Sequence, residues 1–311
     1  MKLAFVFPGQ GSQSVGMLEA YAGLPGVDAV RAEAGAVLGA DFLRVLDEGP
    51  AEALALTVNT QPAMVTVGIA AYRAWTGLGG AVPSVVAGHS LGEYAALVAA
   101  NALSLKDCLP LVRFRAEAMQ QAVPEGVGAM AAIMSLDDDA VRAACADAAQ
   151  GEVVQAVNFN APGQVVIAGH KAAVARAISA CKARGAKRAM SLPVSAPFHS
   201  SLMQPAAERL RAYLAQVPLA APQIDLINNV DVAIVQSPDA VRDALVRQAA
   251  SPVRWVETVQ AMAARGVTHI LECGPGKVLA GLVKRIAPEL QGISLADRDA
   301  LEQALTAVRE A

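Results

Sequence analysis

The sequence predicts an α/β fold built on a parallel sheet, with a smaller antiparallel subdomain inserted into it. Short apolar runs that end at glycine or proline alternate with longer segments of helical period, which is typical of buried parallel strands joined by crossover helices. In the middle of the chain the order changes to strand, helix, strand, strand, helix, strand. The strands of the parallel sheet are expected at residues 3–7, 85–87, 224–227 and 269–273.

Helices are expected between these strands, and the sequence marks two of their starts. Pro62 follows Thr60 closely, and a proline in the first turn of a helix loses no useful amide, so one helix is expected to begin near Thr60. Ser104 and Asp107 have the spacing of a capping box ahead of a second apolar helix.

The inserted subdomain is expected over residues 126–196, where the βαββαβ order is that of a ferredoxin-like domain. Pro124 and Gly126 at one end, and Pro197 at the other, mark its limits. The large α/β domain is then formed by residues 1–125 and 197–311.

Bulk composition narrows the class of protein. With 311 residues, 54% of them apolar, the chain can bury a large core, and a formal charge of -3 gives no basic surface for nucleic acid or an anionic membrane. The N-terminal apolar run is too short for a signal peptide or a membrane span. We expect a soluble, cytoplasmic monomer. The four cysteines are scattered, form no metal-binding or disulfide pattern and favour a reducing compartment: Cys108, Cys145, Cys181 and Cys273.

The segment VVAGHSLGEYAAL raises the question of a nucleophile. Gly88, Ser90 and Gly92 form GxSxG between a predicted strand and a predicted helix, which is the context of a nucleophile elbow. A side chain on either flank of so tight a turn would collide with neighbouring strands, which explains the two glycines. The alternative is that Ser90 only caps the helix.

A serine hydroxyl needs a base, and the chain has four histidines. His89 adjoins Ser90 in the turn, and His170 and His269 are interpreted as structural. His199 lies at a loop-to-helix junction where the chain leaves the insert, and it is the candidate base, with a surface loop histidine as the alternative. Because a carboxylate placed as in a hydrolase triad is not evident, a dyad is expected, with the imidazole held by backbone carbonyls.

Arg115 is the second unusual residue. At helical spacing it shares an apolar face with Leu111, Val112, Ala118 and Met119, without an acid three or four residues away. A buried guanidinium needs an anion, so Arg115 either extends to water past the apolar side chains or binds a ligand carboxylate.

Two glycine-rich turns invite a nucleotide-binding interpretation and do not support it. Gly9 and Gly11 fit the dinucleotide fingerprint, but Ser14 stands at the third glycine position, and residues 274–277 lack the Walker spacing. Both segments are expected to be tight turns from a strand into a helix. The first could place the amide of Gln10 beside the elbow as an oxyanion donor.

Taken as a set, these residues resemble the malonyl-CoA:acyl carrier protein transacylase family, and the resemblance covers nearly the whole chain. Several motifs in register are more specific than GxSxG alone. In the order of that family they are FPGQGSQ, TQPA, GHSLGE, FRAEAMQ, AVNFNAPGQVVIAG, PVSAPFHSSLM and ECGPGKVL.

The resemblance implies a ping-pong acyl transfer for fatty acid synthesis, in an α/β-hydrolase-like large domain with a ferredoxin-like insert. Ser90 would attack the thioester of malonyl-CoA, with His199 as general base. The malonyl group would then pass to the phosphopantetheine thiol of acyl carrier protein. Neither a metal nor a redox cofactor is implied.

The resemblance also assigns supporting roles. The amides of Gln10 and Leu91 would hold the oxyanion, and Arg115 would grip the malonyl carboxylate. Gln248 stands at the position whose carbonyl orients the histidine. Phe198, directly before His199, fills a place where enzymes that prefer methylmalonyl tend to have a smaller residue, and Leu91 fits the same malonyl preference.

Other functions stay open at this point. A serine hydrolase or thioesterase would release free malonate without carrier protein. A docking module with a dead site would have no turnover for Ser90→Ala to remove. The sequence also leaves open a trans-acting role in a polyketide pathway.

Overall fold

The computed structural model describes residues 1–194 and 196–310. Its larger sheet has five strands in the order β7-β2-β1-β8-β9, and β1 pairs in parallel with both β2 and β8. The four predicted runs are all strands of this sheet, and the fifth strand, β9, was not predicted. The strands are β1 Leu3–Phe7, β2 Val85–Gly88, β7 Asp225–Leu226, β8 His269–Glu272 and β9 Gln291–Ser294.

Both faces of the parallel sheet are buried, as expected for this kind of sheet. Along β1, Leu3, Phe5 and Phe7 join one apolar cluster, whereas Ala4 and Val6 join another. The second cluster includes α11 (Trp255–Ala264) and α12 (Val278–Ile286). The first cluster contains residues of α1 Val27–Leu38, α2 Ala40–Glu48, α3 Ala51–Ala55, α4 Thr57–Gly77, α5 Gly92–Ala99, α6 Leu105–Gln120, α9 Gln204–Leu214, α10 Pro238–Ala249 and α13 Arg298–Glu310.

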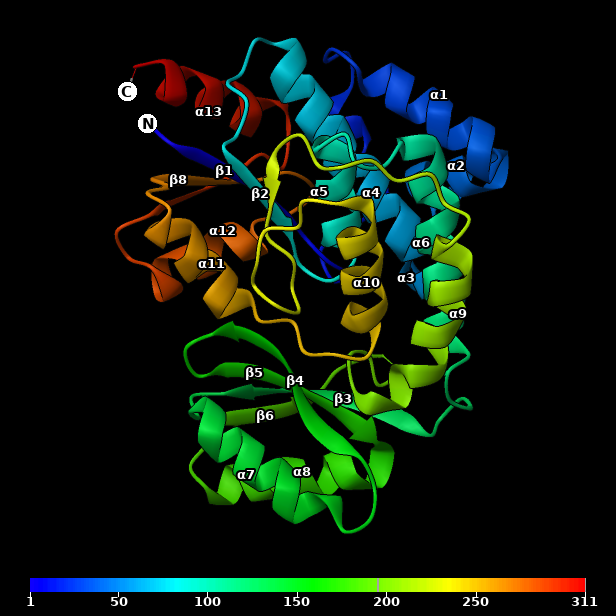
Figure 1. Cartoon of the computed structure of the whole chain (residues 1–311), viewed down its shortest axis with the longest axis vertical. Helices are drawn as coiled ribbons and strands as arrows, with labels where there is room; N and C mark the ends of the chain where they lie inside the picture. The colour runs from blue at the N-terminus through cyan, green and yellow to red at the C-terminus, as the bar shows by residue number, and fades with distance from the viewer. Residues whose placement is uncertain (195, 311) are drawn as a thin grey trace.

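The inserted subdomain has the predicted βαββαβ order. Its four strands pair antiparallel in the order β4-β5-β3-β6, and α7 and α8 pack on one face of the sheet. In Figure 1 these two helices lie at the bottom, with the small sheet between them and the rest of the molecule. The limits 126–196 of the subdomain stay a prediction. Its elements are β3 Gly128–Met134, α7 Asp138–Ala149, β4 Val154–Ala161, β5 Gln164–His170, α8 Lys171–Ala183 and β6 Arg188–Ser191.

The subdomain sheet is joined to the large domain along a seam between β4 and the segment that connects α10 to α11. The amide of Phe159 donates to the Val253 carbonyl at 3.0 Å, and the amide of Val253 donates to the Val157 carbonyl at 2.8 Å. A small apolar cluster on the face of the subdomain sheet that does not carry α7 and α8 includes Val157 and has Phe198 packed against it. The seam therefore places the subdomain over the segment that carries His199.

Two local predictions about helix starts can be compared with the structure. The N-cap half of the capping box is confirmed, because Ser104 Oγ accepts from the Asp107 amide at 3.0 Å at the start of α6, whereas Asp107 Oδ2 accepts from the Ser104 hydroxyl at 2.6 Å. The predicted helix start near Thr60 is wrong: α4 begins at Thr57, and Pro62 lies inside it. Thr60 Oγ1 donates to the carbonyl of Leu54 at 2.6 Å, so this side chain bonds to the preceding segment and caps no helix.

The two glycine-rich turns behave differently. The turn after β8 leads directly into α12, with Gly274 and Gly276 at φ of 134° and 82°, as predicted. The segment after β1 does not lead directly into a helix, because only a short 3-10 turn, η1 (Glu19–Tyr21), precedes α1. A second 3-10 turn, η2 (Ser201–Met203), precedes α9.

Candidate active site

Ser90 lies in a strained turn between β2 and α5. Its φ of 53° is in the left-handed region, which a non-glycine residue seldom adopts. A Cβ on Gly88 would lie 1.8 Å from the carbonyl carbon of Gly92, and one on Gly92 would lie 2.1 Å from the Phe7 oxygen. The turn therefore requires glycine on both sides. The capping alternative for Ser90 is wrong, because α5 has Leu91 at its N-cap and no side chain caps it.

His199 faces the serine directly. Its Nε2 lies 2.7 Å from Ser90 Oγ, and its Nδ1 lies 2.9 Å from the backbone oxygen of Gln248. A carbonyl can only accept, so Nδ1 carries the proton and Nε2 is left to accept from the hydroxyl. The carbonyl is available because Gln248 is in the last turn of α10. His199 is 3% exposed, so the alternative of a surface loop histidine is wrong.

The environment keeps His199 neutral. Burial, together with the nearby Arg115 cation, lowers the pKa of His199 to about 3. At neutral pH the imidazole is therefore uncharged and can take a proton from Ser90. A carboxylate bound to Arg115 would weaken the effect of that cation and make the imidazole a stronger base.

Arg115 reaches the same atom from α6. The guanidinium is 1% exposed, and its Nη2 donates to Ser90 Oγ at 3.0 Å and to Gln248 Oε1 at 2.9 Å. Its Nη1 donates to Gln61 Oε1 at 2.8 Å, and the Tyr94 ring centroid lies 5.3 Å from its central carbon. Within the described part of the chain, Arg115 Nε has no hydrogen-bond partner. The alternative in which Arg115 extends to water is wrong, and a donor is left for a ligand.

Gln10 and Leu91 follow neighbouring strands at the same edge of the sheet. Phe7 of β1 is in register with Gly88 of β2, so Gln10 and Leu91 come equally soon after two paired residues. Among the residues that the structure describes, the backbone amide of neither one donates a recorded hydrogen bond. Both residues line the cavity that Ser90 lines. That these two amides form an oxyanion hole stays a prediction.

A cavity of about 130 Å³ holds the site, between the elbow and the subdomain sheet. Phe198 forms part of its wall, and Met130 and Asn158 come from the subdomain. A second cavity of about 350 Å³ shares Gln10, His89, Asn158 and Leu192 with the first, so the two are neighbours. The site therefore lies at the junction of the two sheets.

The other three histidine rings have partners other than Ser90 Oγ. His89 Nε2 lies 2.8 Å from Asn160 Oδ1, and the ring packs near Trp255. His170 Nδ1 accepts from the Val153 amide at 2.9 Å, and His269 Nδ1 lies 2.9 Å from Thr268 Oγ1. These contacts agree with their structural interpretation.

Sequence reasoning missed three polar residues of the site. Gln61 binds Arg115. Glu93 binds Gln248 and the amide of Asn229, and the Asn229 side chain binds the backbone of the elbow. Gln61 and Glu93 lie within the motifs TQPA and GHSLGE, but no local pattern assigns them a partner. Asn229 lies outside every motif that was recognised.

Metal binding and membrane insertion find no support in the described residues. They contain no group of three or more histidine, cysteine, aspartate or glutamate side chains that could hold a metal ion. None of the helices in residues 1–194 and 196–310 is long and apolar enough to cross a membrane.

Acyl transfer through a serine ester is the chemistry that such an elbow, base and amide pair can perform. The family model described as "Acyl transferase domain" matches residues 4–297, and the chain is an acyltransferase. It is 54% identical to the malonyl CoA-acyl carrier protein transacylase of Escherichia coli (strain K12), over 98% of this chain and 99% of that protein. It is 43% identical to the protein of the same name from Bacillus subtilis (strain 168), over 99% of this chain and 98% of that protein. The chain belongs to the malonyl CoA-acyl carrier protein transacylase family.

Solved structures are similar over the same extent. The acyl-carrier-protein S-malonyltransferase of Burkholderia pseudomallei 1710b is 62% identical with a TM-score of 0.96, over 98% of this chain and all of that one. A malonyl-transacylase solved in complex with its type II PKS acyl-carrier protein is 50% identical with a TM-score of 0.97, over 99% of this chain and all of that one. These likenesses support the predicted fold class.

Proposed function

We propose that the chain transfers malonyl groups from malonyl-CoA to the phosphopantetheine thiol of acyl carrier protein, through a malonyl ester on Ser90. The observation that carries this proposal is the position of Ser90 Oγ, 2.7 Å from His199 Nε2 and 3.0 Å from Arg115 Nη2. A nucleophile, its base and a cation for a carboxylate meet at one atom. The names of the relatives in Escherichia coli and Bacillus subtilis support the same reaction.

In the first half-reaction His199 takes the proton of Ser90 as the serine oxygen attacks the thioester carbonyl. The amides of Gln10 and Leu91 hold the oxyanion at the positive end of α5. The carbon–sulfur bond then breaks, and His199 returns the proton to the sulfur of CoA. Malonyl-Ser90 and free CoA result.

In the second half-reaction the carrier-protein thiol occupies the place that CoA left. His199 takes the thiol proton, the sulfur attacks the ester carbonyl of malonyl-Ser90, and the proton returns to Ser90 Oγ. The same two amides hold the second oxyanion. Each half-reaction begins and ends with a neutral imidazole, which the low pKa of His199 favours.

Arg115 selects acyl groups that carry a second carboxylate. Its Nε has no partner among the described residues, and its Nη2 can exchange the bond to Ser90 Oγ for one to the ligand, so that the two nitrogens offer parallel donors that match a carboxylate. Phe198 narrows the cavity beside His199 and favours malonyl over branched groups. We assign the protein to fatty acid synthesis in the cytoplasm and to a monomeric state. Four buried cysteines without disulfides support the cytoplasmic assignment.

The test is intact-protein mass spectrometry after incubation with malonyl-CoA alone. A single malonyl mark that maps to Ser90, and that moves to acyl carrier protein when this is added, is the expected result. Ser90→Ala should acquire no mark. Rapid release of free malonate without carrier protein would instead indicate a thioesterase, and an unmarked wild-type protein would contradict the proposal.

One relative favours a second role. The 50% identical malonyl-transacylase was solved with a type II PKS acyl-carrier protein. Competition between a fatty acid carrier protein and a polyketide carrier protein for malonyl-Ser90 would separate the two pathways.

A further inference from the structure

Glu93 is a buried carboxylate next to the site, and it has no role in the proposed transfer steps. It lies in the first turn of α5 and is 2% exposed. Its Oε2 accepts from Gln248 Nε2 at 2.9 Å and from the backbone amide of Asn229 at 2.9 Å. Burying a carboxylate is costly unless its contacts compensate, so these two bonds show what it stabilises.

The first bond fixes which way the Gln248 amide points. An ionised carboxylate can only accept, so Gln248 must turn its NH2 group toward Glu93 and its oxygen toward Arg115. Gln248 Oε1 then accepts from Arg115 Nη2 at 2.9 Å, and its Nε2 also donates to the Ser90 carbonyl at 3.0 Å. The backbone oxygen of the same residue holds His199. Gln248 thus touches both the base and the cation, and Glu93 holds its amide in place together with Arg115 and the Ser90 carbonyl.

The second bond supports the elbow. Asn229 Oδ1 accepts from the Ser90 amide at 2.8 Å, and Asn229 Nδ2 donates to the Gly88 carbonyl at 2.7 Å. These bonds hold the strained turn in its conformation. Glu93 binds the backbone amide of Asn229, and it therefore helps to position Ser90 through Asn229.

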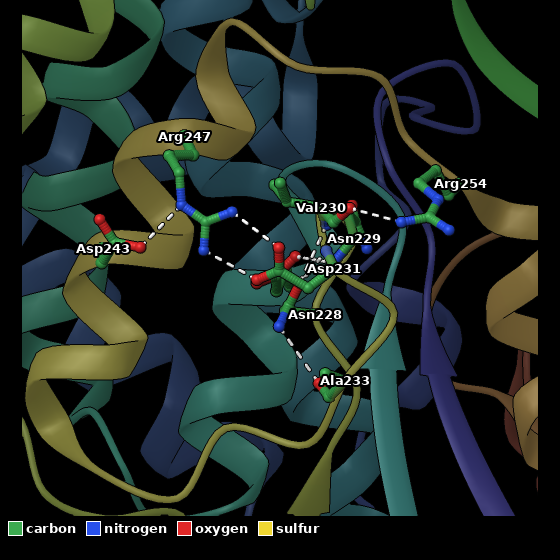
Figure 2. A network of polar contacts seen from close by, with 9 residues as sticks. Asn228, Asn229, Val230, Asp231, Ala233, Asp243, Arg247 and Arg254 are labelled. Carbon is green, nitrogen blue, oxygen red and sulfur yellow. Dashed lines mark hydrogen bonds and ion pairs between the residues drawn. The ribbon is translucent and has the colours of Figure 1, made fainter.

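The loop that carries Asn229 is also held from outside (Figure 2). Arg247 donates to both carboxylate oxygens of Asp231, at 2.8 and 2.7 Å, and Arg254 Nη1 donates to the Val230 carbonyl at 3.0 Å. The arginine and aspartate side chains of these contacts are partly exposed, and exposed ion pairs stabilise little. The buried bond to Glu93 is therefore the stronger constraint on this loop.

We propose that Glu93 is a positioning residue, which orients Gln248 and Asn229 so that Arg115, His199 and Ser90 are aligned for malonyl transfer. The inference rests on the roles proposed for Gln248 and Arg115. It assigns Glu93 no contact with substrate. Its effect is transmitted through the two amide side chains.

The role of Glu93 depends on its charge, and this gives a pH readout. Two charged groups face it: Arg115 from α6, which favours the ionised form, and Asp231 from the loop after β7, which opposes it and is itself paired with Arg247. Burial outweighs Arg115 and raises the pKa of Glu93 to about 7. Below this pH the carboxyl is neutral, so its bonds to the Gln248 side chain and to the Asn229 amide lose their charge assistance, and Glu93 holds both residues less firmly. His199 stays neutral over the same range.

The test compares Glu93→Gln with wild type in kcat/KM for malonyl-CoA and acetyl-CoA, over roughly two pH units on either side of neutrality. Wild-type kcat/KM for malonyl-CoA should fall as the pH is lowered through 7. The kcat/KM of Glu93→Gln for malonyl-CoA should be about tenfold to a hundredfold lower than that of wild type at alkaline pH. It should not show the fall below pH 7, and the variant should discriminate less against acetyl-CoA. If Glu93→Gln keeps the fall in kcat/KM below pH 7, or keeps the full preference for malonyl-CoA, the inference is overturned.

Glu272→Gln is the matched control. Glu272 is another fully buried carboxylate, and burial raises its pKa to about 7 as well, but it binds the Ala280 amide at the start of α12. Glu272→Gln should keep both the fall in kcat/KM below pH 7 and the preference for malonyl-CoA over acetyl-CoA. If Glu93→Gln does not fold, Glu93→Asp replaces it: a lower rate with the fall below pH 7 retained is expected, and a wild-type rate contradicts the role. Malonylation of wild-type Ser90 in the same preparation separates failure of this inference from failure of the proposed function.

Discussion

At the scale of single residues, the proposed role of Arg115 in binding the malonyl carboxylate leads to the first prediction. Arg115→Ala should lower kcat/KM for malonyl-CoA by roughly a hundredfold, because charge-assisted hydrogen bonds to a carboxylate are worth about 1.5–3 kcal/mol. The same change removes the cation that lowers the pKa of His199, so transfer of acetyl groups should improve. A competition assay with malonyl-CoA and acetyl-CoA measures both effects.

The neighbouring Arg113 provides the control for this prediction. It is on the same helix, but its guanidinium lies over the Phe42 ring, 5.6 Å from the centroid, and away from the cavity. Arg113→Ala should leave the malonyl preference unchanged. If both variants keep the wild-type preference, Arg115 does not bind the malonyl carboxylate.

Residues of the site differ in how far the sequence alone indicates them. Ser90 is marked by its motif, His199 by elimination among four histidines, and Arg115 by its place on an apolar face. Gln248 could be named only from the family resemblance, because its backbone carbonyl, not its side chain, meets His199. Glu93 looks like any acid in the first turn of a helix, and only tertiary contacts reveal its two partners.

The elbow between β2 and α5 is the element on which the geometry depends. Gly88→Ala should destabilise the protein by about 3 kcal/mol, because a Cβ there would overlap the backbone of Gly92 at 1.8 Å and the backbone must move. Movement of this turn also displaces Ser90 from His199, so activity should fall more steeply than stability. Urea denaturation, combined with turnover at a temperature where the variant is folded, measures the two losses.

Gly281→Ala is the contrasting substitution. Gly281 lies within α12, and nothing lies within 4 Å of the Cβ that alanine would add. Alanine there should stabilise the protein by about 0.5–1 kcal/mol through higher helix propensity, without changing turnover. Equal effects of the two substitutions would show that crowding at the elbow is not the cause of the loss.

Element prediction succeeded where a physical pattern is strong. Buried parallel strands are continuous apolar runs, and four of these were recognised. The strand β9 was missed because Gln291 and Gly292 are exposed at the edge of the sheet and the run is short and partly polar. The start of α4 was misplaced because Pro62 is tolerated inside the helix, and its position alone does not show this.

At the scale of the molecule, the sequence predicts two sheets but not how they meet. The βαββαβ order follows from periodicity, whereas the seam depends on bonds that Val157 and Phe159 of β4 make with Val253, which is distant from them in the chain. Such pairings leave no local signal. The cavity at the seam, and with it the setting of His199, therefore becomes visible only in the structure.

Buried carboxylates also make the stability of the whole molecule depend on pH. Glu272 is fully buried at the end of β8, and burial raises its pKa from an ordinary value of 4.5 to about 7. Because the folded state holds this proton more tightly than the unfolded state, folding favours the neutral form. The contribution of Glu272 is most favourable below pH 4.5, declines as the pH rises to about 7, and is constant above it.

Glu272→Gln should remove this pH dependence, since a glutamine stays neutral and keeps an oxygen to accept from the Ala280 amide. The free energy of unfolding of the variant, relative to wild type, should therefore rise between acidic and alkaline pH by up to about 3 kcal/mol, because a tenfold difference in proton affinity between the folded and unfolded states corresponds to about 1.4 kcal/mol. Urea denaturation of both proteins below pH 5 and above pH 7 measures the difference. Glu48→Gln, at an exposed position, is the surface control for the substitution. A Glu272→Gln difference that is flat, or that falls as the pH rises, would mean that burial of this carboxylate does not oppose its ionisation.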